Sequence, residues 1–260
     1  MSMNRFEGKS ALITGASGGI GSAIVLRFLQ EGCKVLATDI NEETLKKLQA
    51  EMDEKFPGKC FTMICNVTKK SEAEKAMAKG WELFGTLDKL INVAGGSLPG
   101  CPTHLLEVTE ERWDMIMDLN AKSTFFFGQE FIRMHKEHGT TGDIVNFASQ
   151  AGIVPNEYAR PHYAAAKGAV VSLTRHMSKE FAPQGFRVNA IAPGYCASGE
   201  RIRQLWKIRD EQGVSEKMLW NVAMHRLAEP SEEAAAVAFL ASDDASYITG
   251  EILNVCGGGF

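Results

Sequence analysis

Two residues four positions apart, Tyr163 and Lys167, have the types and spacing for proton transfer. The alanine-rich segment around them predicts a helix, so both side chains lie on one helical face, one turn apart. A phenol has a reference pKa of about 10, and an ammonium within ~4–6 Å favours the phenolate, so we expect Lys167 to lower the pKa of Tyr163. Ser149, at the end of an apolar run, could hold a substrate oxygen beside the phenol. Together these groups could move a proton on or off an alcohol or carbonyl oxygen.

A tyrosine and a lysine at this spacing also occur on ordinary helix surfaces, so the interpretation depends on the rest of the chain. A short buried-type strand, Ser10–Thr14, is followed by a glycine turn and an amphipathic helix from Ser22. The glycines of this turn are Gly15, Gly18, Gly19 and Gly21. Glycines allow a tight turn and let the backbone approach a pyrophosphate at the helix N-terminus. Tight turns also use glycine, but strand, turn and helix in this order favour dinucleotide binding.

Asp39 ends the next predicted strand, 18 residues after Gly21. A carboxylate at this place can accept hydrogen bonds from the ribose hydroxyls of NAD. It would also repel the 2′-phosphate of NADP, at about 3 kcal/mol per unit charge pair for ~5 Å and an effective dielectric constant of ~20. No arginine or lysine occupies position 17, 40 or 41 to offset that repulsion. The sequence therefore predicts NAD as the cofactor, and Asp39 could also cap the helix predicted after it.

Composition limits the classes of protein. The 260 residues carry a net charge of −4 with 23% charged residues, which suits a soluble globule and gives no indication of nucleic-acid binding. The N-terminus has no signal-peptide core and no apolar run is long enough for a membrane span, so we expect a cytoplasmic protein without a membrane partner. Six scattered cysteines without Cys-x-x-Cys spacing indicate free thiols. His135 and His138 could share a metal, but a solvated helix end fits them better, so no metal site is expected.

Strands and helices alternate along the whole chain. Further strands are predicted at 60–65, 89–93, up to Ser149, 186–192 and 251–255, and helices at 42–54, 71–83, 110–138, from Tyr163 and at 231–240. This alternation, without linker or repeat, predicts an α/β protein: one Rossmann-fold domain over residues 1–260, with a doubly wound parallel sheet of about seven strands.

The chain resembles the short-chain dehydrogenase/reductase family over essentially its whole length. Thr14-Gly15-Ala-Ser-Gly18-Gly-Ile-Gly21 matches that family's TGxxxGxG, and Asn92-Val-Ala-Gly95 matches its NNAG with one change. Its catalytic tetrad is matched in order and approximate spacing by Asn120, Ser149, Tyr163 and Lys167, and Pro193-Gly194 matches the PG after the sixth strand. Several motifs in the right order, on the right elements, make the resemblance specific.

The resemblance implies roles for these residues. Tyr163 would be the general acid/base, Lys167 would lower its pKa and hold the nicotinamide ribose, and Ser149 would hydrogen-bond the substrate oxygen. Asn120 would position a water in the proton relay. The implied cofactor-binding residues are Gly15, Ser17, Gly18, Gly19, Ile20, Gly21, Asp39, Ile40, Asn66, Val67, Asn92, Ala94, Gly95, Tyr163, Lys167, Pro193, Gly194, Cys196 and Ser198. The substrate-binding residues would be Ser149, Gln150, Tyr163 and Tyr195. The resemblance also suggests a homotetramer or homodimer, with helices 110–138 and 163–181 pairing across an interface.

Four positions depart from the family pattern. Asn66 stands where an aspartate usually contacts the adenine; its amide oxygen can still accept a hydrogen bond, so we expect binding to be retained. Val93 replaces an asparagine, which affects packing more than chemistry. Ser198 replaces a threonine that touches the nicotinamide carboxamide, and its hydroxyl can serve. Cys256 replaces an aspartate, and the sequence offers no interpretation of that change.

The substrate is set in this fold by the loop 96–105, the loop 150–162 and the segment 195–224, which is predicted to be a mobile helical lid. The loop before Tyr163 is one residue longer than usual in the family. The lid carries Trp206, Met218, Trp220 and Met224, which could line an apolar pocket or pack within the lid itself.

Charges on the lid could attract an acidic substrate. The cations are Arg201, Arg203, Lys207 and Arg209, and the acids are Glu200, Asp210, Glu211 and Glu216. Because the two sets nearly balance, a solvated helix face is the preferred interpretation. Arg160 and His162, beside Tyr163, are a weaker indication of the same kind.

Three functions remain open from the sequence. The leading hypothesis is an NAD-dependent oxidoreductase that acts on a small-molecule secondary alcohol or ketone, such as a hydroxysteroid, a sugar or polyol, a 3-oxoacyl thioester or a small hydroxy acid. The second is a nucleotide-binding regulatory protein that has lost turnover, against which the intact tetrad argues. The third is an epimerase or dehydratase, whose usual larger C-terminal domain this chain has no residues to form.

Overall fold

Seven parallel strands form the centre of the structure, a computed structural model that describes residues 4–98, 100–154 and 159–259. Their order in the sheet is β3 (Cys60–Ile64), β2 (Lys34–Asp39), β1 (Ser10–Thr14), β4 (Lys89–Asn92), β5 (Asp143–Phe147), β6 (Arg187–Pro193) and β7 (Ile252–Val255). The predicted fold class is confirmed. The strand order reverses between β1 and β4, and ligands of such sheets bind outside the carboxyl ends of the strands at this point.

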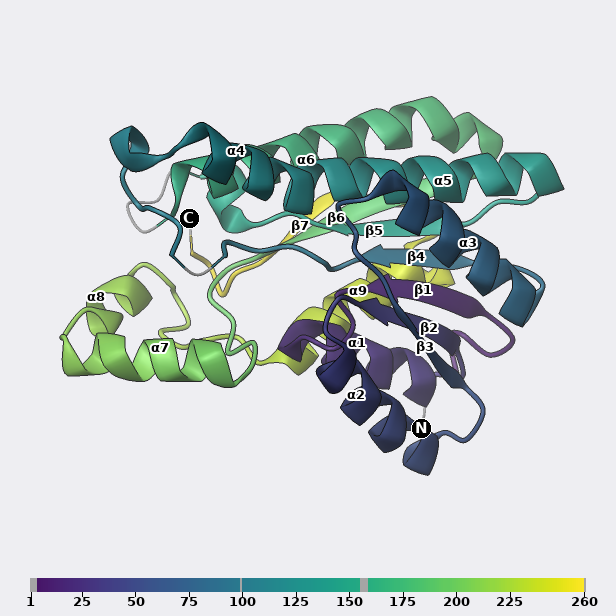
Figure 1. The fold of residues 1–260 in the computed structure, drawn as a ribbon, viewed down its shortest axis with the longest axis horizontal. Coiled ribbons are helices and arrows are strands. Elements are labelled where there is room, and N and C mark those ends of the chain that lie inside the picture. Colours follow the sequence, from purple (N-terminus) through teal and green to yellow (C-terminus); the bar gives the residue numbers. More distant parts are fainter. Residues whose placement is uncertain (1–3, 99, 155–158, 260) are drawn as a thin grey trace.

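Helices cover both faces of the sheet (Figure 1). One layer contains α1 (Gly19–Gln30), α2 (Glu42–Lys55) and α9 (Pro230–Ala241), and the other contains α3 (Lys70–Phe84), α4 (Glu110–Met117), α5 (Ser123–His138) and α6 (Pro161–Phe181). Two further helices, α7 (Glu200–Glu211) and α8 (Ser215–Trp220), stand to one side, beyond the carboxyl ends of the strands. None of the helices in the described part of the chain is long and apolar enough to cross a membrane.

Alternate residues of the strands supply the two cores. Leu12 and Leu36 pack with the helices α3, α5 and α6, whereas Ile13 and Val35 pack with α1, α2 and α9, and all four are fully buried. Successive side chains of a strand point to opposite faces, so a parallel sheet covered on both sides needs apolar residues at every position. This explains why the strands are continuous apolar runs in the sequence.

The predicted continuous helix 110–138 is interrupted by a π-helical turn at Asp118–Lys122, between α4 and α5. Asn120 lies in this turn and is fully buried, and its side-chain amide donates to the carbonyl oxygen of Ile116 at 2.9 Å. A π-turn holds one residue more than an α-helical turn and is frequent at functional sites.

The interpretation of His135 and His138 as a solvated helix end is wrong for the first of them. His135 is fully buried, with Nε2 2.8 Å from the carbonyl oxygen of Leu87 and Nδ1 2.7 Å from the hydroxyl of Thr140. Burial lowers the pKa of its ring. His138 is exposed, as expected. Within residues 4–98, 100–154 and 159–259, no three histidine, cysteine or acidic side chains are grouped to hold a metal, and all six cysteines are free and buried.

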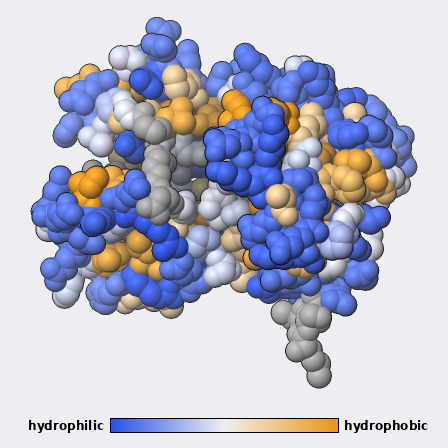
Figure 2. Space-filling model, turned by 60° about the horizontal axis from the view of Figure 1, so that its bottom comes forward, coloured by the Kyte–Doolittle hydropathy of each residue, from blue (hydrophilic) through white to orange (hydrophobic). Residues whose placement is uncertain are grey.

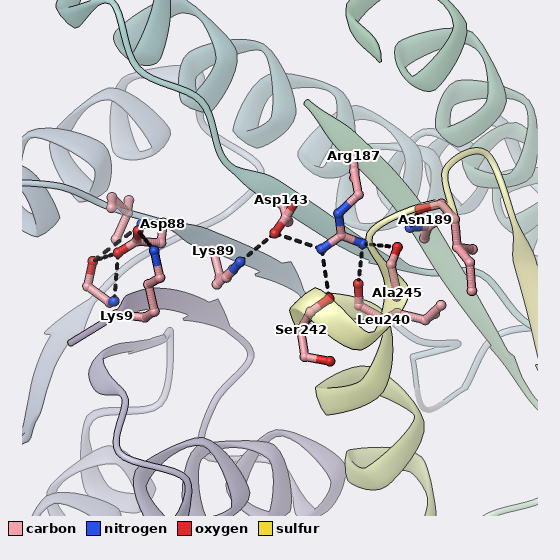
Figure 3. A network of polar contacts seen from close by, with 12 residues as sticks. Lys9, Asp88, Lys89, Asp143, Arg187, Asn189, Leu240, Ser242 and Ala245 are labelled. Atoms are coloured by element: carbon pink, nitrogen blue, oxygen red, sulfur yellow. Dashed lines mark hydrogen bonds and ion pairs between the residues drawn. The ribbon is translucent and has the colours of Figure 1, made fainter. Parts of the chain in front are cut away.

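A chain of ion pairs joins the amino ends of the central strands, opposite the glycine turn (Figure 3). Asp143 on β5 pairs with Lys89 on β4 and with Arg187 on β6, whose Nη2 lies 2.8 Å from the carboxylate. Arg187 also donates to three backbone carbonyls at the end of α9, those of Leu240, Ser242 and Ala245. The Arg187 side chain is only 13% exposed, so this guanidinium ties α9 to the sheet in a largely dry place.

Replacing Arg187 by methionine should therefore lower the free energy of unfolding by about 3–5 kcal/mol, because it leaves three carbonyls without their donor and removes one of the two cations that pair with the Asp143 carboxylate. Urea unfolding followed by circular dichroism would measure the change. Lys9→Met is the control, since Lys9 is 45% exposed and pairs only with Asp88 in Figure 3. That change should cost less than about 1 kcal/mol. Equal effects of the two substitutions would contradict the role given to Arg187.

Candidate active site

Four predicted catalytic residues meet at the carboxyl end of the sheet. Tyr163 and Lys167 lie on α6, with the Lys167 Nζ 5.7 Å from the centre of the Tyr163 ring. Ser149 follows β5, and its side chain hydrogen-bonds to that of Tyr163. Lys167 is buried and donates to the carbonyl oxygen of Phe147, the last residue of β5, at 2.7 Å. The strand β5 and the helix α6 therefore hold the phenol, the hydroxyl and the amine together.

Asn120 reaches the same place from the π-turn and binds the loop after β4. Its Oδ1 accepts from the backbone N–H of Gly96 at 2.8 Å, and its Nδ2 donates to the carbonyl oxygen of Gly96 at 3.1 Å. Gly95 has a φ of +156°, and a Cβ there would lie 2.6 Å from Asn120 Oδ1 and 3.1 Å from Lys167 Nζ. Only glycine allows this approach. Both N–H groups of the Asn120 amide and its oxygen bond to backbone groups of Gly96 and Ile116, so this side chain holds the loop after β4 against the π-turn.

Burial sets the pKa values of the pair on α6. The pKa of Tyr163 is raised, because burial disfavours the phenolate more than the Ser149 hydrogen bond favours it. Burial lowers the pKa of Lys167 to about 7. The net shift in the pKa of Tyr163 is therefore upward, and its causes are burial and the Ser149 hydrogen bond rather than the expected effect of Lys167.

Two polar residues behind the site, Asn146 and Thr174, were missed by the sequence analysis. The Asn92 amide on β4 donates to Asn146 Oδ1 on β5 at 2.9 Å, and Asn146 donates to the hydroxyl of Thr174 on α6 at 3.0 Å. The hydroxyl of Thr14 accepts from the backbone N–H of Ala94 at 3.2 Å. All of these side chains are buried. The hydrogen bonds from Asn92 to Asn146 and from Asn146 to Thr174 fix β4 and β5 to α6. The asparagine within the apolar run 142–148 was the sequence signal that could have revealed this network.

The glycine turn has the shape expected of a phosphate cradle. A Cβ on Gly21 would lie 2.1 Å from the carbonyl oxygen of Gly15, and one on Gly19 would lie 2.6 Å from the backbone of Ser198. Gly18 caps α1 without a side-chain hydrogen bond, so the first N–H groups of the helix, from Gly19 and Ile20, remain available to an anion. The residues therefore fit a dinucleotide pyrophosphate.

Asp39 lies at the end of β2 beside this cradle. One carboxylate oxygen accepts from the backbone N–H of Ser17 at 3.1 Å, and the other accepts from that of Asn41 at 3.1 Å. The side chain of Asn41, not that of Asp39, caps α2 by accepting from the N–H of Thr44. Asp39 is half-buried and held from both sides, and the neighbouring Ile40 is 66% exposed.

The amide oxygen of Asn66 is already used within the chain. It accepts from the backbone N–H of Thr68 at 3.1 Å and from its hydroxyl at 2.8 Å. Because an amide NH₂ cannot accept, this pattern fixes which side of the amide is the oxygen. Both acceptor positions of this oxygen are therefore occupied by Thr68, which leaves none for the adenine. The neighbouring Val67 is buried and packs in the core under α3.

The segment after β6 runs over the N-terminus of α1. Gly194 follows Pro193 and donates its N–H to Val255 on β7 at 3.0 Å; a Cβ on Gly194 would touch Cys256 at 3.0 Å. Cys196 is buried, and the pKa of its thiol is raised to about 12 by burial and by acidic residues of α9, Glu233 first among them. The buried thiol is therefore protonated at neutral pH.

The apolar residues of the predicted lid divide into two sets. Trp206 and Met218 are buried, so they pack within the protein, whereas Trp220 and Met224 are exposed by 74% and 64%. The Trp206 ring packs edge-on against Tyr195 at 5.4 Å. The side chains of Glu200 and Arg201, like residues 155–158 of the predicted substrate loop, lie outside the described part of the structure.

Two hollows lie close to these elements. One of about 780 Å³ separates α7 from the start of α9 and is lined by charged residues, including Arg203, Lys207 and Glu229. Another of about 300 Å³ lies between α4 and the start of α6, lined by Leu105, Trp113 and His162 among others. Figure 2 shows a mostly hydrophilic surface that is hollowed on the α7–α8 side, with hydrophobic residues in small separate groups.

Comparisons with known proteins agree with this geometry. A family model described as enoyl-(acyl carrier protein) reductase matches residues 15–259. The chain is 37% identical over 255 residues to a 3-oxoacyl-[acyl-carrier-protein] reductase of Thermotoga maritima, with 98% of both chains covered. It is 34% identical over 256 residues to 3beta-hydroxysteroid dehydrogenase 2 of Eggerthella lenta, covering 96% of this chain and 94% of that one. The crystal structure of levodione reductase matches with a TM-score of 0.88 at 31% identity, covering 97% of this chain and 98% of that one.

The chain belongs to the short-chain dehydrogenase/reductase family. Proteins of this family are oxidoreductases that act on alcohol or keto groups with a nicotinamide cofactor. The named relatives act on substrates of very different size, so family membership leaves the substrate of this chain open.

Proposed function

We propose that the protein is an NAD-dependent oxidoreductase that interconverts a secondary alcohol and a ketone. The observation that carries this proposal is the meeting of Tyr163, Ser149 and Lys167 at the carboxyl end of β5, next to a glycine cradle whose neighbouring carboxylate is Asp39. The first group of residues can bind and protonate an oxygen, and the second fits a dinucleotide that lacks a 2′-phosphate.

Each residue of the site has its own role in the reaction. The bound nicotinamide supplies or accepts the hydride. Tyr163 is a neutral phenol at pH 7, because its pKa is raised, and this form donates a proton to a carbonyl oxygen during reduction. Ser149 holds that oxygen by a hydrogen bond. Lys167 is anchored by the carbonyl oxygen of Phe147, and its remaining N–H groups can point to a sugar hydroxyl. Helices α7 and α8 act as a cover that excludes water.

A substrate panel tests the proposal. Hydroxysteroid ketones, keto sugars, 3-oxoacyl thioesters and small oxo acids would be incubated with NADH and, separately, with NADPH, and oxidation of the cofactor would be followed at 340 nm. We expect turnover of at least one class, with a higher kcat/KM for NADH. Binding of NADH without turnover of any ketone would instead favour a nucleotide-binding protein that has lost its activity.

A further inference from the structure

The loop after β4 is held against the site by two side chains. Its first part is fixed by Asn120, whose amide bonds to the N–H and the carbonyl oxygen of Gly96 at 2.8 and 3.1 Å. Its later part is fixed by Arg160, whose Nη1 donates to the hydroxyl of Ser97 at 2.8 Å and whose Nε donates to the carbonyl oxygen of Cys101 at 3.0 Å. These hydrogen bonds join the loop to the π-turn on one side and to α6 on the other.

Arg160 stands at the N-terminus of α6, three residues before Tyr163. It is the N-cap residue of the helix, but its side chain makes no capping hydrogen bond. The side chain is therefore not needed to start the helix, and two of its donors are directed to the loop instead. Hydrogen bonds from a guanidinium are charge-assisted, and its rigid fork fixes their direction. Arg160 thus sets the position of Ser97 and Cys101 relative to the start of α6.

The part of the loop that Arg160 holds lies beside the phenol of the site. Cys101 is 6% exposed and forms a buried cluster with Ile116 and Ala166. Leu98 and Tyr163 both pack against this cluster. The loop therefore supplies part of the wall next to the Tyr163 ring, and any shift of the loop moves this wall.

We propose that Arg160 is a positioning residue of the reaction: it clamps Ser97 and Cys101 so that the loop after β4 holds the substrate ketone against Tyr163. The inference rests on the proposed oxidoreductase function and names a residue that this function needs away from the reacting atoms. A misplacement of about 1 Å can cost roughly 100-fold in rate, so a residue that only holds a wall can have a large effect. The glycine cradle belongs to β1 and α1, so the clamp acts on the ketone and not on NADH.

Steady-state kinetics of Arg160→Met test the clamp, because methionine keeps the apolar stem of the side chain and removes its donors. With the best ketone of the panel, we expect kcat to fall by roughly 10- to 100-fold while the KM for NADH stays unchanged. Arg160→Lys keeps a donor and should recover part of the loss. Arg175→Met is the matched control, since Arg175 is an exposed arginine of the same helix and its loss should change neither value. An unchanged kcat in Arg160→Met, or an equal fall in Arg175→Met, would overturn the proposal.

A double-mutant cycle with Ser97 separates the clamp from a general loss of stability. Ser97→Ala removes the acceptor of one of the two hydrogen bonds and should lower kcat by less than Arg160→Met does. In Arg160→Met that bond is already lost, so the addition of Ser97→Ala should cost nothing further. Additive losses would show that the two residues act independently and would contradict the clamp.

The thiol of Cys101 gives a readout without turnover, because it is free and buried and its backbone is held by Arg160. Alkylation by iodoacetamide, followed by peptide mass spectrometry, should become at least about 10-fold faster at Cys101 in Arg160→Met, since a lost charge-assisted bond favours local opening by roughly that factor. Cys33, fully buried in the core under α1, is the internal reference and should react at an unchanged rate.

The two readouts separate the clamp from the proposed function. An unchanged alkylation rate at Cys101 would overturn the clamp and leave the oxidoreductase standing. Faster alkylation of Cys101 in Arg160→Met, in a protein that reduces no ketone, would support the clamp and contradict the proposed function.

Discussion

The Tyr163→Phe variant should lose kcat by about 10²- to 10⁴-fold, the usual contribution of a general acid or base, while its affinity for NADH stays nearly unchanged. The substitution removes only the hydroxyl. The ring still packs against the buried cluster of Cys101, Ile116 and Ala166, and Lys167 keeps its bond to the carbonyl oxygen of Phe147. Steady-state rates with the best ketone of the panel and NADH binding by fluorescence would measure the two effects separately.

A suitable control makes the same change where no chemistry is expected. Tyr247 follows the short 3-10 helix after α9 and is fully exposed, so Tyr247→Phe should leave both kcat and NADH binding unchanged. Activity of Tyr163→Phe near that of the unmodified protein would show that another group transfers the proton. A large loss of NADH affinity would show that the phenol supports the cofactor rather than the reaction.

The Asp39→Ser variant should shift the ratio of kcat/KM for NADH to that for NADPH by about 100-fold towards NADPH, which corresponds to removing one charge repulsion of about 3 kcal/mol. Asp39 is held in place by the N–H groups of Ser17 and Asn41, so its carboxylate cannot simply turn away from a 2′-phosphate. A serine keeps an acceptor for the ribose hydroxyls but removes the charge. Kinetics with both cofactors, at one ionic strength, would give the ratio.

Glu43→Gln provides the matched control for Asp39. Glu43 lies in the first turn of α2, a few residues from Asp39, but it is exposed and pairs with Lys47. Exposed charges are screened by salt and solvent, so its removal should leave the cofactor ratio unaffected. An unchanged ratio in Asp39→Ser, or an equal shift in Glu43→Gln, would mean that the cofactor is selected elsewhere.

Features of the site that depend on spacing within one or two adjacent elements could be predicted, whereas the hydrogen-bond partners of side chains and the contacts between remote segments could not. Tyr163 and Lys167 were found because helical spacing alone places them on one face, and the glycine turn was found because strand, glycines and helix follow each other directly. The hydrogen bonds from Thr68 to the amide oxygen of Asn66 join residues only two positions apart. They could not be predicted, because composition and periodicity do not indicate which partner a polar side chain binds. The buried His135 ring contacts the carbonyl oxygen of Leu87, a residue far away in the chain, so its burial could not be predicted from local sequence.

The amino-acid sequence by itself determined the order of strands and helices, the parallel sheet, the family and the positions of the phenol, the amine and the glycines, because each depends on periodicity or on spacing within one or two adjacent elements. The tertiary structure alone decided the electrostatics. Burial raises the pKa of Tyr163 and lowers that of Lys167 to about 7, and the spacing of the two residues along the chain carries no information on burial. It also decided that Arg203 on α7 pairs with Glu229 at the start of α9, at 3.5 Å. The energy of a charge depends on its distance from water and from other charges, and these distances are set only when remote segments pack together.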